Sequence, residues 1–231
     1  MTENSISLEQ IAAENQRYMV KVYSWMFAAL VITGSVAFLS SQYEPIRNLI
    51  FENSWIIFGL LIFEFIAVGV LVKLVYKMSV PVATLIFVIY SVLNGITFSL
   101  IFLIYTSESI ALTFFVTAGT FGVMSIFGYL TKTDLSKWGN LLFMGVIGLF
   151  LAGIANWFLK SEILHWITTF AGVLIFVGLT AHDTQKIKNA NIIGNEGSDD
   201  DHKESIMGAL ILYLDFINLF LYLLRIFGRR K

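Results

Sequence analysis

The C-terminal part of the chain contains the stretch IMGALILYLDFINLFLYLLRIF, which runs from Ile206 to Phe227. It is almost entirely apolar and long enough to cross the hydrocarbon core of a bilayer, for which a helix needs about 20 residues. A carboxylic acid, Asp215, and an amide, Asn218, lie in its middle. Acids at membrane depth are costly and mark functional sites by default. The stretch therefore predicts a membrane helix that carries function.

The composition of the whole chain agrees with a membrane protein. Hydrophobic residues make up 57% of the 231 residues and charged residues only 13%, whereas a soluble domain carries about 25% charged residues. The formal net charge is −1, and no basic stripe indicates a nucleic-acid partner. There is no cysteine, which excludes disulfides and thiolate chemistry. The polar first twenty residues predict that no cleavable signal peptide precedes the first span.

Seven apolar stretches are long enough to span a bilayer. They are residues 22–40, 54–74, 80–105, 110–130, 138–159, 163–182 and 206–227. Backbone polar groups in lipid must be paired within the segment, which favours helices. We therefore expect an all-α integral membrane protein with a polar N-terminal segment (1–21), a single seven-helix domain (22–228) and a basic tail (229–231).

The distribution of Lys and Arg predicts the orientation, because basic loops stay in the cytoplasm. Most loop cations lie on the side of the N-terminus, so that side is predicted to be cytoplasmic, in what we expect to be a bacterial cytoplasmic membrane. The basic C-terminal end conflicts with a full seventh crossing and would suit a re-entrant segment. The length of the last stretch suits a full span, which we expect.

Polar residues of the last stretch fall on one face of a helix. At 100° per residue, an arc of about 100° contains Gly208, Asp215, Asn218, Tyr222 and Arg225. This stripe has to face protein or water rather than lipid. The last helix is therefore predicted to lie at the centre of the bundle, although Asp215 and Asn218 can also serve only as hydrogen-bonding contacts between helices.

A second acid, Asp183, ends the sixth stretch. Taken alone, Asp183 is predicted to be a solvent-exposed acid at the end of a helix, but Asp215 is a candidate partner for it. Two buried carboxylates a few Å apart cannot both ionise cheaply, so they share a proton. Protonated, the pair would tie the last two helices together; ionised, it would repel and admit a cation. The neighbouring His182 titrates in the physiological range and is a candidate to tune this latch.

A third intramembrane acid, Glu64, lies near the middle of the second stretch and is a candidate for a cation route. Lys73 and Lys77 at the end of that stretch are weaker candidates for a counter-ion to Asp183. The run 199–201 of three aspartates lacks the spacing of an EF-hand, so we expect a flexible acidic loop there. No nucleophile–base pair, metal-protease motif or phosphate-binding loop appears, which argues against an enzyme and against a tightly bound cofactor.

Two motifs resemble the Bax inhibitor-1 proteins (the transmembrane Bax inhibitor motif family), in particular their bacterial members. One motif is GLTAHDTQKIK at residues 178–188, and the other covers residues 209–227, including the phrase YLDFINLF. Shorter matches lie at residues 94–97, 127–129 and 134–136. The resemblance covers essentially the whole chain after about Val20.

The resemblance implies a seven-helix bundle with the last helix central and a calcium-permeable leak governed by pH. Asp183 and Asp215 match the aspartates implied to form its latch, and Glu64 matches an acid implied in ion passage. Ca²⁺ would then be the permeant ion, protons the regulator, and the lipid bilayer the constant partner.

Two departures from the family pattern concern the latch. Many relatives carry Tyr where this chain has His182, which is expected to shift the pH range. A bacterial relative has Arg at the end of the second helix, where only Lys73 and Lys77 are available here, and Lys lacks the bidentate fork of Arg.

A different class of function stays open at this point: a regulatory membrane protein that transports nothing and acts on a membrane-protein partner, such as a membrane protease or a cell-death factor. In that case residues 1–17 and the loop 189–204 would carry the activity. An intramembrane aspartyl protease is disfavoured, because the expected Gly-x-Gly-Asp signature is absent.

Overall fold

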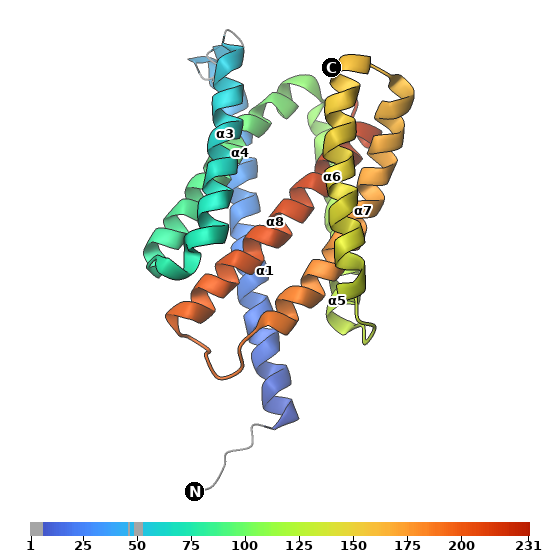
Figure 1. Ribbon diagram of the computed structural model, residues 1–231. Coiled ribbons are helices and arrows are strands. Elements are labelled where there is room, and N and C mark those ends of the chain that lie inside the picture. The colour runs from blue at the N-terminus through green and yellow to red at the C-terminus, as the bar shows by residue number, and fades with distance from the viewer. Residues whose placement is uncertain (1–6, 46, 49–52) are drawn as a thin grey trace, which may run out of the picture. The chain divides into compact units, whose positions relative to one another are not determined.

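The computed structural model describes residues 7–45, 47–48 and 53–231 (Figure 1). Among these residues, seven helices are long and apolar enough to cross a membrane. They are α1 (Leu8–Gln42), α3 (Ser54–Leu74), α4 (Val80–Ile104), α5 (Ser107–Leu130), α6 (Ser136–Leu159), α7 (Glu162–Ala190) and α8 (Asp199–Phe227), with a 3-10 turn, η1 (Val75–Lys77), after α3. Each predicted apolar stretch corresponds to one of these helices, which confirms the all-α membrane fold.

Helix α1 begins well before its apolar part. Ser7 caps it: its hydroxyl accepts a hydrogen bond from Gln10 N at 3.2 Å, and Gln10 Oε1 accepts one from Ser7 N at 2.9 Å. This capping box satisfies two otherwise unpaired backbone groups of the first turn. The predicted polar segment 1–21 is therefore helical from Leu8 onward, and its residues 1–6 lie outside the described part of the chain.

Helix α7 continues to Ala190, eight residues beyond the predicted end at His182. Thr184, Gln185 and Ile187 are buried, so the added turns pack against protein although they are not apolar throughout. Gln185 Nε2 donates to Thr133 O at 2.8 Å, and Gln185 Oε1 accepts from Leu135 N at 2.8 Å. The extension thus holds the connection between α5 and α6.

Helix α8 begins at Asp199, so the expectation of a flexible acidic loop at residues 199–201 is wrong. The three aspartates form the first turn of α8, where carboxylates are stabilised by the positive end of the helix dipole and by unpaired backbone N–H groups. Asp201 is the most buried of the three, and its Oδ2 accepts from Gly197 N at 2.8 Å. Acids at this position begin a helix rather than interrupt one.

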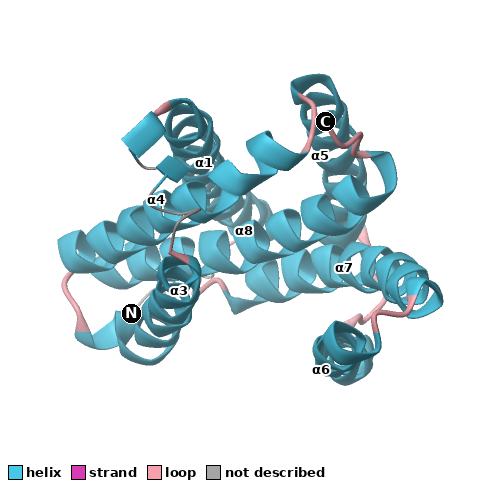
Figure 2. Ribbon diagram, turned by 90° about the horizontal axis from the view of Figure 1, so that it is seen from above, coloured by secondary structure: helices cyan, strands magenta, loops and turns pink. Residues whose placement is uncertain are grey.

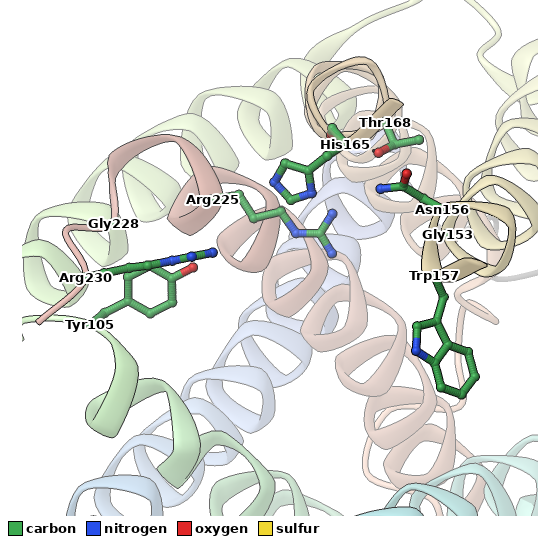
Figure 3. Close-up of a pocket in the computed structure, with 9 residues that line it drawn as sticks. All are labelled: Tyr105, Gly153, Asn156, Trp157, His165, Thr168, Arg225, Gly228 and Arg230. Atoms are coloured by element: carbon green, nitrogen blue, oxygen red, sulfur yellow. Dashed lines mark hydrogen bonds between the residues drawn. The ribbon is translucent and has the colours of Figure 1, made fainter. Parts of the chain in front are cut away.

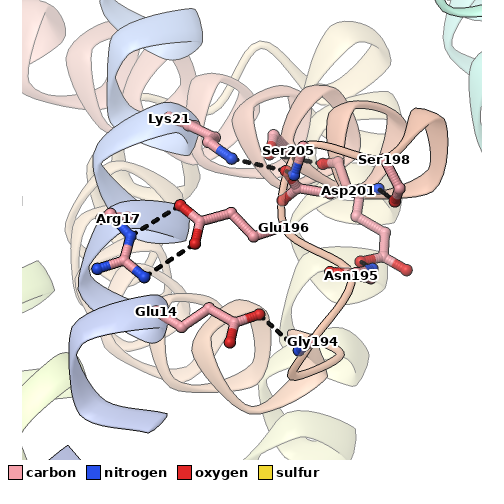
Figure 4. Close-up of polar contacts among 11 residues, drawn as sticks. Glu14, Arg17, Lys21, Gly194, Asn195, Glu196, Ser198, Asp201 and Ser205 are labelled. Carbon is pink, nitrogen blue, oxygen red and sulfur yellow. Dashed lines mark hydrogen bonds and ion pairs between the residues drawn. The ribbon is translucent and has the colours of Figure 1, made fainter. Parts of the chain in front are cut away.

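The connection between α7 and α8 is held by the first turns of α1 (Figure 4). Arg17 donates from Nε and Nη2 to the two oxygens of Glu196 at 2.7 and 2.8 Å. Glu14 accepts from Gly194 N at 2.7 Å, and Lys21 Nζ lies 2.6 Å from Asp201 Oδ2. We call this set of contacts the α1 clasp.

The described chain divides into two compact units. Unit 1 contains residues up to Leu103 together with Ala190–Leu210, and unit 2 contains Ile104–Asn189 and Ile211–Lys231. Helix α8 runs from the first into the second. The single domain predicted for residues 22–228 stays a prediction.

Helix α8 is the most buried of the seven helices. In its most apolar window 67% of the residues are buried, against 6% to 33% in the other helices. This confirms the prediction that the last helix is central. Helix α6 is the opposite extreme, at 6%. Within unit 2 it lies alongside α7 (Figure 2), where Gly145 contacts Ile175 and Gly178 contacts Leu142.

Candidate functional site

Close backbone packing in unit 2 positions the polar end of α7. The backbone of Gly128 in α5 lies against the carbonyl of Ala181, so closely that no side chain fits between them. On α6, a Cβ at Gly139 would come within 2.6 Å of Nε2 of His182. Small residues allow helix backbones to approach in lipid. Two glycines on neighbouring helices therefore place α7 and orient the ring of His182.

His182 and Asp183 form a direct contact. Nδ1 of His182 lies 2.7 Å from Oδ1 of Asp183, and the two side chains are 12% and 15% exposed. A neutral imidazole can donate to an ionised carboxylate or accept from a protonated one. The proximity predicted from adjacency in the sequence is thus an actual hydrogen-bond distance.

Asp183 also meets Asp215 of α8, whose residue is only 5% exposed. The two carboxyl groups lie within hydrogen-bonding reach of one another. Oδ2 of Asp215 is buried, and no hydrogen-bond donor reaches it from the described residues. Buried polar atoms nearly always have a hydrogen-bond partner. A proton shared between the two carboxyl groups would supply a hydrogen bond between them. The structure therefore brings together the two acids that the sequence analysis singled out.

The rest of the polar stripe has mixed surroundings. The Tyr222 ring packs against Gly172 of α7 and stacks on Phe176 with ring centroids 5.8 Å apart. Asn218 Nδ2 donates to Leu214 O of its own helix at 2.8 Å. Arg225 is exposed, with its guanidinium 4.8 Å from the centre of the Tyr222 ring. The stripe thus faces α7 at Asp215 and Tyr222 and opens to the surroundings at Arg225.

Glu64 has a partner that the sequence analysis did not name. Thr97 of α4 donates its hydroxyl to Glu64 Oε1 at 2.6 Å, and Glu64 is half-buried. Thr97 shares a helix with the buried Asn94. Hydropathy does not predict which side chains bond across two helices. A Thr hydroxyl in a membrane helix also usually bonds the backbone of its own helix, so this contact was not expected. Glu64 belongs to unit 1 and the aspartates to unit 2, so their shared route stays a prediction.

Lys73 and Lys77 are exposed, at the end of α3 and in η1. Neither forms an ion pair with a described carboxylate. Their pairing with Asp183 stays a prediction. The described residues also contain no group of three or more His, Cys, Asp or Glu side chains that could hold a metal ion.

Comparison with known proteins decides the family. The sequence model of the family described as inhibitor of apoptosis-promoting Bax1 matches residues 15–231. The chain belongs to the Bax inhibitor-1 family. The match includes every site residue discussed above.

Members of this family from distant bacteria align along almost their whole length. The inner membrane protein YbhL of Escherichia coli K12 is 50% identical over 228 residues, which cover 98% of this chain and 97% of the relative. A Rickettsia prowazekii protein is 43% identical, covering 94% of this chain and 91% of its own. A membrane protein of Streptococcus pyogenes is 35% identical, covering 99% of each. With its seven apolar helices, this chain is a multi-pass integral membrane protein.

Proposed function

We propose that this protein is a passive Ca²⁺ leak whose opening is controlled by a proton shared between Asp183 and Asp215. The observation that carries the proposal is the meeting of these two carboxyl groups, with Oδ2 of Asp215 buried and lacking any described donor. Such an arrangement is costly for structure alone, since an amide would pair with fewer penalties. A carboxylate pair at such a position is best explained by a change of protonation during function.

The two protonation states would have opposite effects on the contact between α7 and α8. With one proton, the carboxyl groups form a hydrogen bond and hold the helices together. Without it, two negative charges in a poorly solvated place repel each other. Carboxylate oxygens are also the ligands that Ca²⁺ prefers. Loss of the proton therefore opens the contact and creates a transient cation site in one step.

A further acid would lie along the cation route, in a bacterial cytoplasmic membrane. Glu64, held by Thr97, would supply a second carboxylate along the cation route. The E. coli relative is described as an inner membrane protein, and this chain would likewise reside in a bacterial cytoplasmic membrane. The distribution of Lys and Arg favours a cytoplasmic N-terminus. Ca²⁺ would pass without a resident metal or cofactor, and the proton would be the regulator.

Ca²⁺ flux into liposomes containing the purified protein tests the proposal. The wild type should show flux that changes with pH, and Asp215→Asn should remove that dependence, because an amide cannot share or lose the proton. Asp134→Asn is the matched control, since it removes an exposed carboxylate between α5 and α6. A pH profile in the Asp215 variant that equals the wild type would exclude the pair from gating.

The alternative is a regulatory membrane protein that transports nothing. It is favoured by the α1 clasp, in which the two segments expected to meet a partner, the N-terminal segment and the 189–204 loop, form one joined surface through Arg17 and Glu196. This reading predicts that the purified protein has no Ca²⁺ flux at any pH. It also predicts that Arg17→Glu disturbs a cellular phenotype that Asp215→Asn leaves intact.

A further inference from the structure

A pocket of about 430 Å³ lies at one end of unit 2 (Figure 3). Its polar side chains come from four helix ends and the tail: Tyr105 after α4, Asn156 in the last turns of α6, His165 and Thr168 in the first turns of α7, Arg225 in the last turn of α8, and Arg230 beyond it. Helices α4, α6 and α8 are the third, fifth and seventh crossings and end on the same side of a membrane, where α7 begins. The pocket therefore lies at one membrane face.

The tail that supplies Arg230 is fixed rather than free. Thr106 N donates to Arg229 O and Lys231 N to Ile104 O, both at 2.9 Å, and Tyr105 and Arg230 form an antiparallel bridge. Gly228 allows this course, because a side chain there would meet the Tyr105 ring. The predicted basic tail is thus folded back onto the chain, and its second arginine belongs to a built site.

The pocket is rich in hydrogen-bond donors and has no acid in its lining. Neither Arg225 nor Arg230 forms an ion pair with a carboxylate in the described part of the chain. Asn156 uses Oδ1 to accept from Ser161 N at 2.9 Å, so its amide nitrogen is the group left to face a ligand. Two guanidinium groups with an amide donor fit an oxyanion with several oxygens, above all a phosphate.

Apolar side chains next to the pocket indicate what carries that phosphate. Trp157, Phe158 and Ile163, on the ends of α6 and α7, are 70%, 77% and 75% exposed. Tryptophan at a helix end is typical of the interface between headgroups and acyl chains. In a membrane these exposed side chains contact acyl chains, so the headgroups of the same lipids lie beside the pocket.

We propose that this pocket binds the phosphate of an anionic phospholipid headgroup, with Arg225 and Arg230 as its ligands. A zwitterionic headgroup would bring its ammonium group near two guanidinium groups and would be repelled. The site would therefore select phosphatidylglycerol over phosphatidylcholine. This inference is independent of the Ca²⁺ pathway.

Native mass spectrometry of the full chain, released from micelles doped with one lipid at a time, tests the site. We expect one phosphatidylglycerol to be retained and phosphatidylcholine to be lost. Arg225→Gln and Arg230→Gln should each weaken retention about tenfold, which is the size of a lost hydrogen bond to a charged group. Raising the salt concentration should weaken it further.

Arg229→Gln is the matched control, because it removes the same charge one position away from a residue that lines the pocket. Equal retention of both lipids, or unchanged retention in the Arg225→Gln/Arg230→Gln double variant, would overturn the site. Displacement of the lipid by equimolar inorganic phosphate or glycerol 3-phosphate would show a site for free phosphate instead, and would overturn the lipid assignment. If Arg225→Gln does not fold, the lipid retention of Arg230→Gln alone tests the site, because Arg230 is exposed and lies after the last helix.

Discussion

His182 Nδ1 lies 2.7 Å from Asp183 Oδ1. Because Asp183 in turn meets Asp215, an imidazole is connected to a carboxyl group that is only 5% exposed. The contacts thus join two partly exposed side chains, His182 and Asp183, to the buried Asp215. Such a set of contacts can pass a proton to the buried acid, and it predicts which substitutions will change the pH response of the protein.

Replacing His182 by Phe is expected to shift the pH response of Ca²⁺ flux without abolishing it. The ring keeps its approximate size, but the contact between His182 Nδ1 and Asp183 Oδ1, which supports the ionised form of the carboxyl pair, is lost. Opening of the pair should then need a higher pH, so the pH at which flux is half-maximal should rise. His202→Phe, at an exposed position in the first turns of α8, should leave the half-maximal pH unchanged. An identical profile for both variants would show that His182 has no part in gating.

Gly139→Ala is expected to reproduce the effect of the His182 variant through geometry alone. The added Cβ would lie 2.6 Å from His182 Nε2, so the ring has to move and its contact with Asp183 is lost. Gly148→Ala is the control on the same helix, because nothing lies within 4 Å of a Cβ there. Flux assays at several pH values compare the two, and a Gly139 variant that behaves like the Gly148 variant contradicts the positioning role.

Glu64→Gln is expected to lower Ca²⁺ flux and to leave its pH midpoint in place. Glutamine can still accept a hydrogen bond from Thr97, so the fold persists while the charge is removed. The proton-sharing pair is untouched. Thr97→Val should cost about 1 kcal/mol of stability, since it leaves a half-buried carboxylate without its donor. Flux equal to the wild type in the Glu64 variant would remove this residue from the route.

The α1 clasp is expected to loosen in acid. The hydrogen bonds from Arg17 hold the pKa of Glu196 below its ordinary value of 4.5. A carboxylate with a lowered pKa stabilises the folded contact fully above 4.5, and this contribution disappears as the pH falls through the lowered value. The protection of residues 191–198 against hydrogen exchange, corrected for the intrinsic rates, should decrease as the pH is lowered through that value. Arg17→Gln should reduce protection already at pH 7, whereas Arg47→Gln should not.

Gln185→Ala is expected to destabilise the protein by about 2 kcal/mol, because two hydrogen bonds at a buried position are lost at about 1 kcal/mol each. Both bonds go to the connection between α5 and α6. Lys186→Ala, at the exposed neighbouring position, should change stability by less than about 0.5 kcal/mol. Unfolding of the detergent-solubilised protein by denaturant measures both variants.

Much of the architecture was predictable because crossing a bilayer is a local requirement. About 20 apolar residues identify a span wherever they occur, and all seven predicted stretches correspond to helices. The ends were less predictable, since α1, α7 and α8 extend into polar residues. Their extensions depend on Ser7 as a cap, on Gln185 as a bridge and on Asp201 as an acid at a helix start, and hydropathy registers none of these.

The sequence by itself determined that acids lie at membrane depth and that Asp215 shares a face with Asn218 and Arg225, because helical periodicity is a property of one segment. Only the tertiary structure decided that Asp183 meets Asp215, that Gly139 makes room for His182, and that Arg230 returns to Tyr105. Each of these contacts joins residues from different segments. In a membrane such contacts depend on side-chain size and close packing between helices, because lipid is as apolar as the helix surfaces and hydrophobicity alone does not select partners.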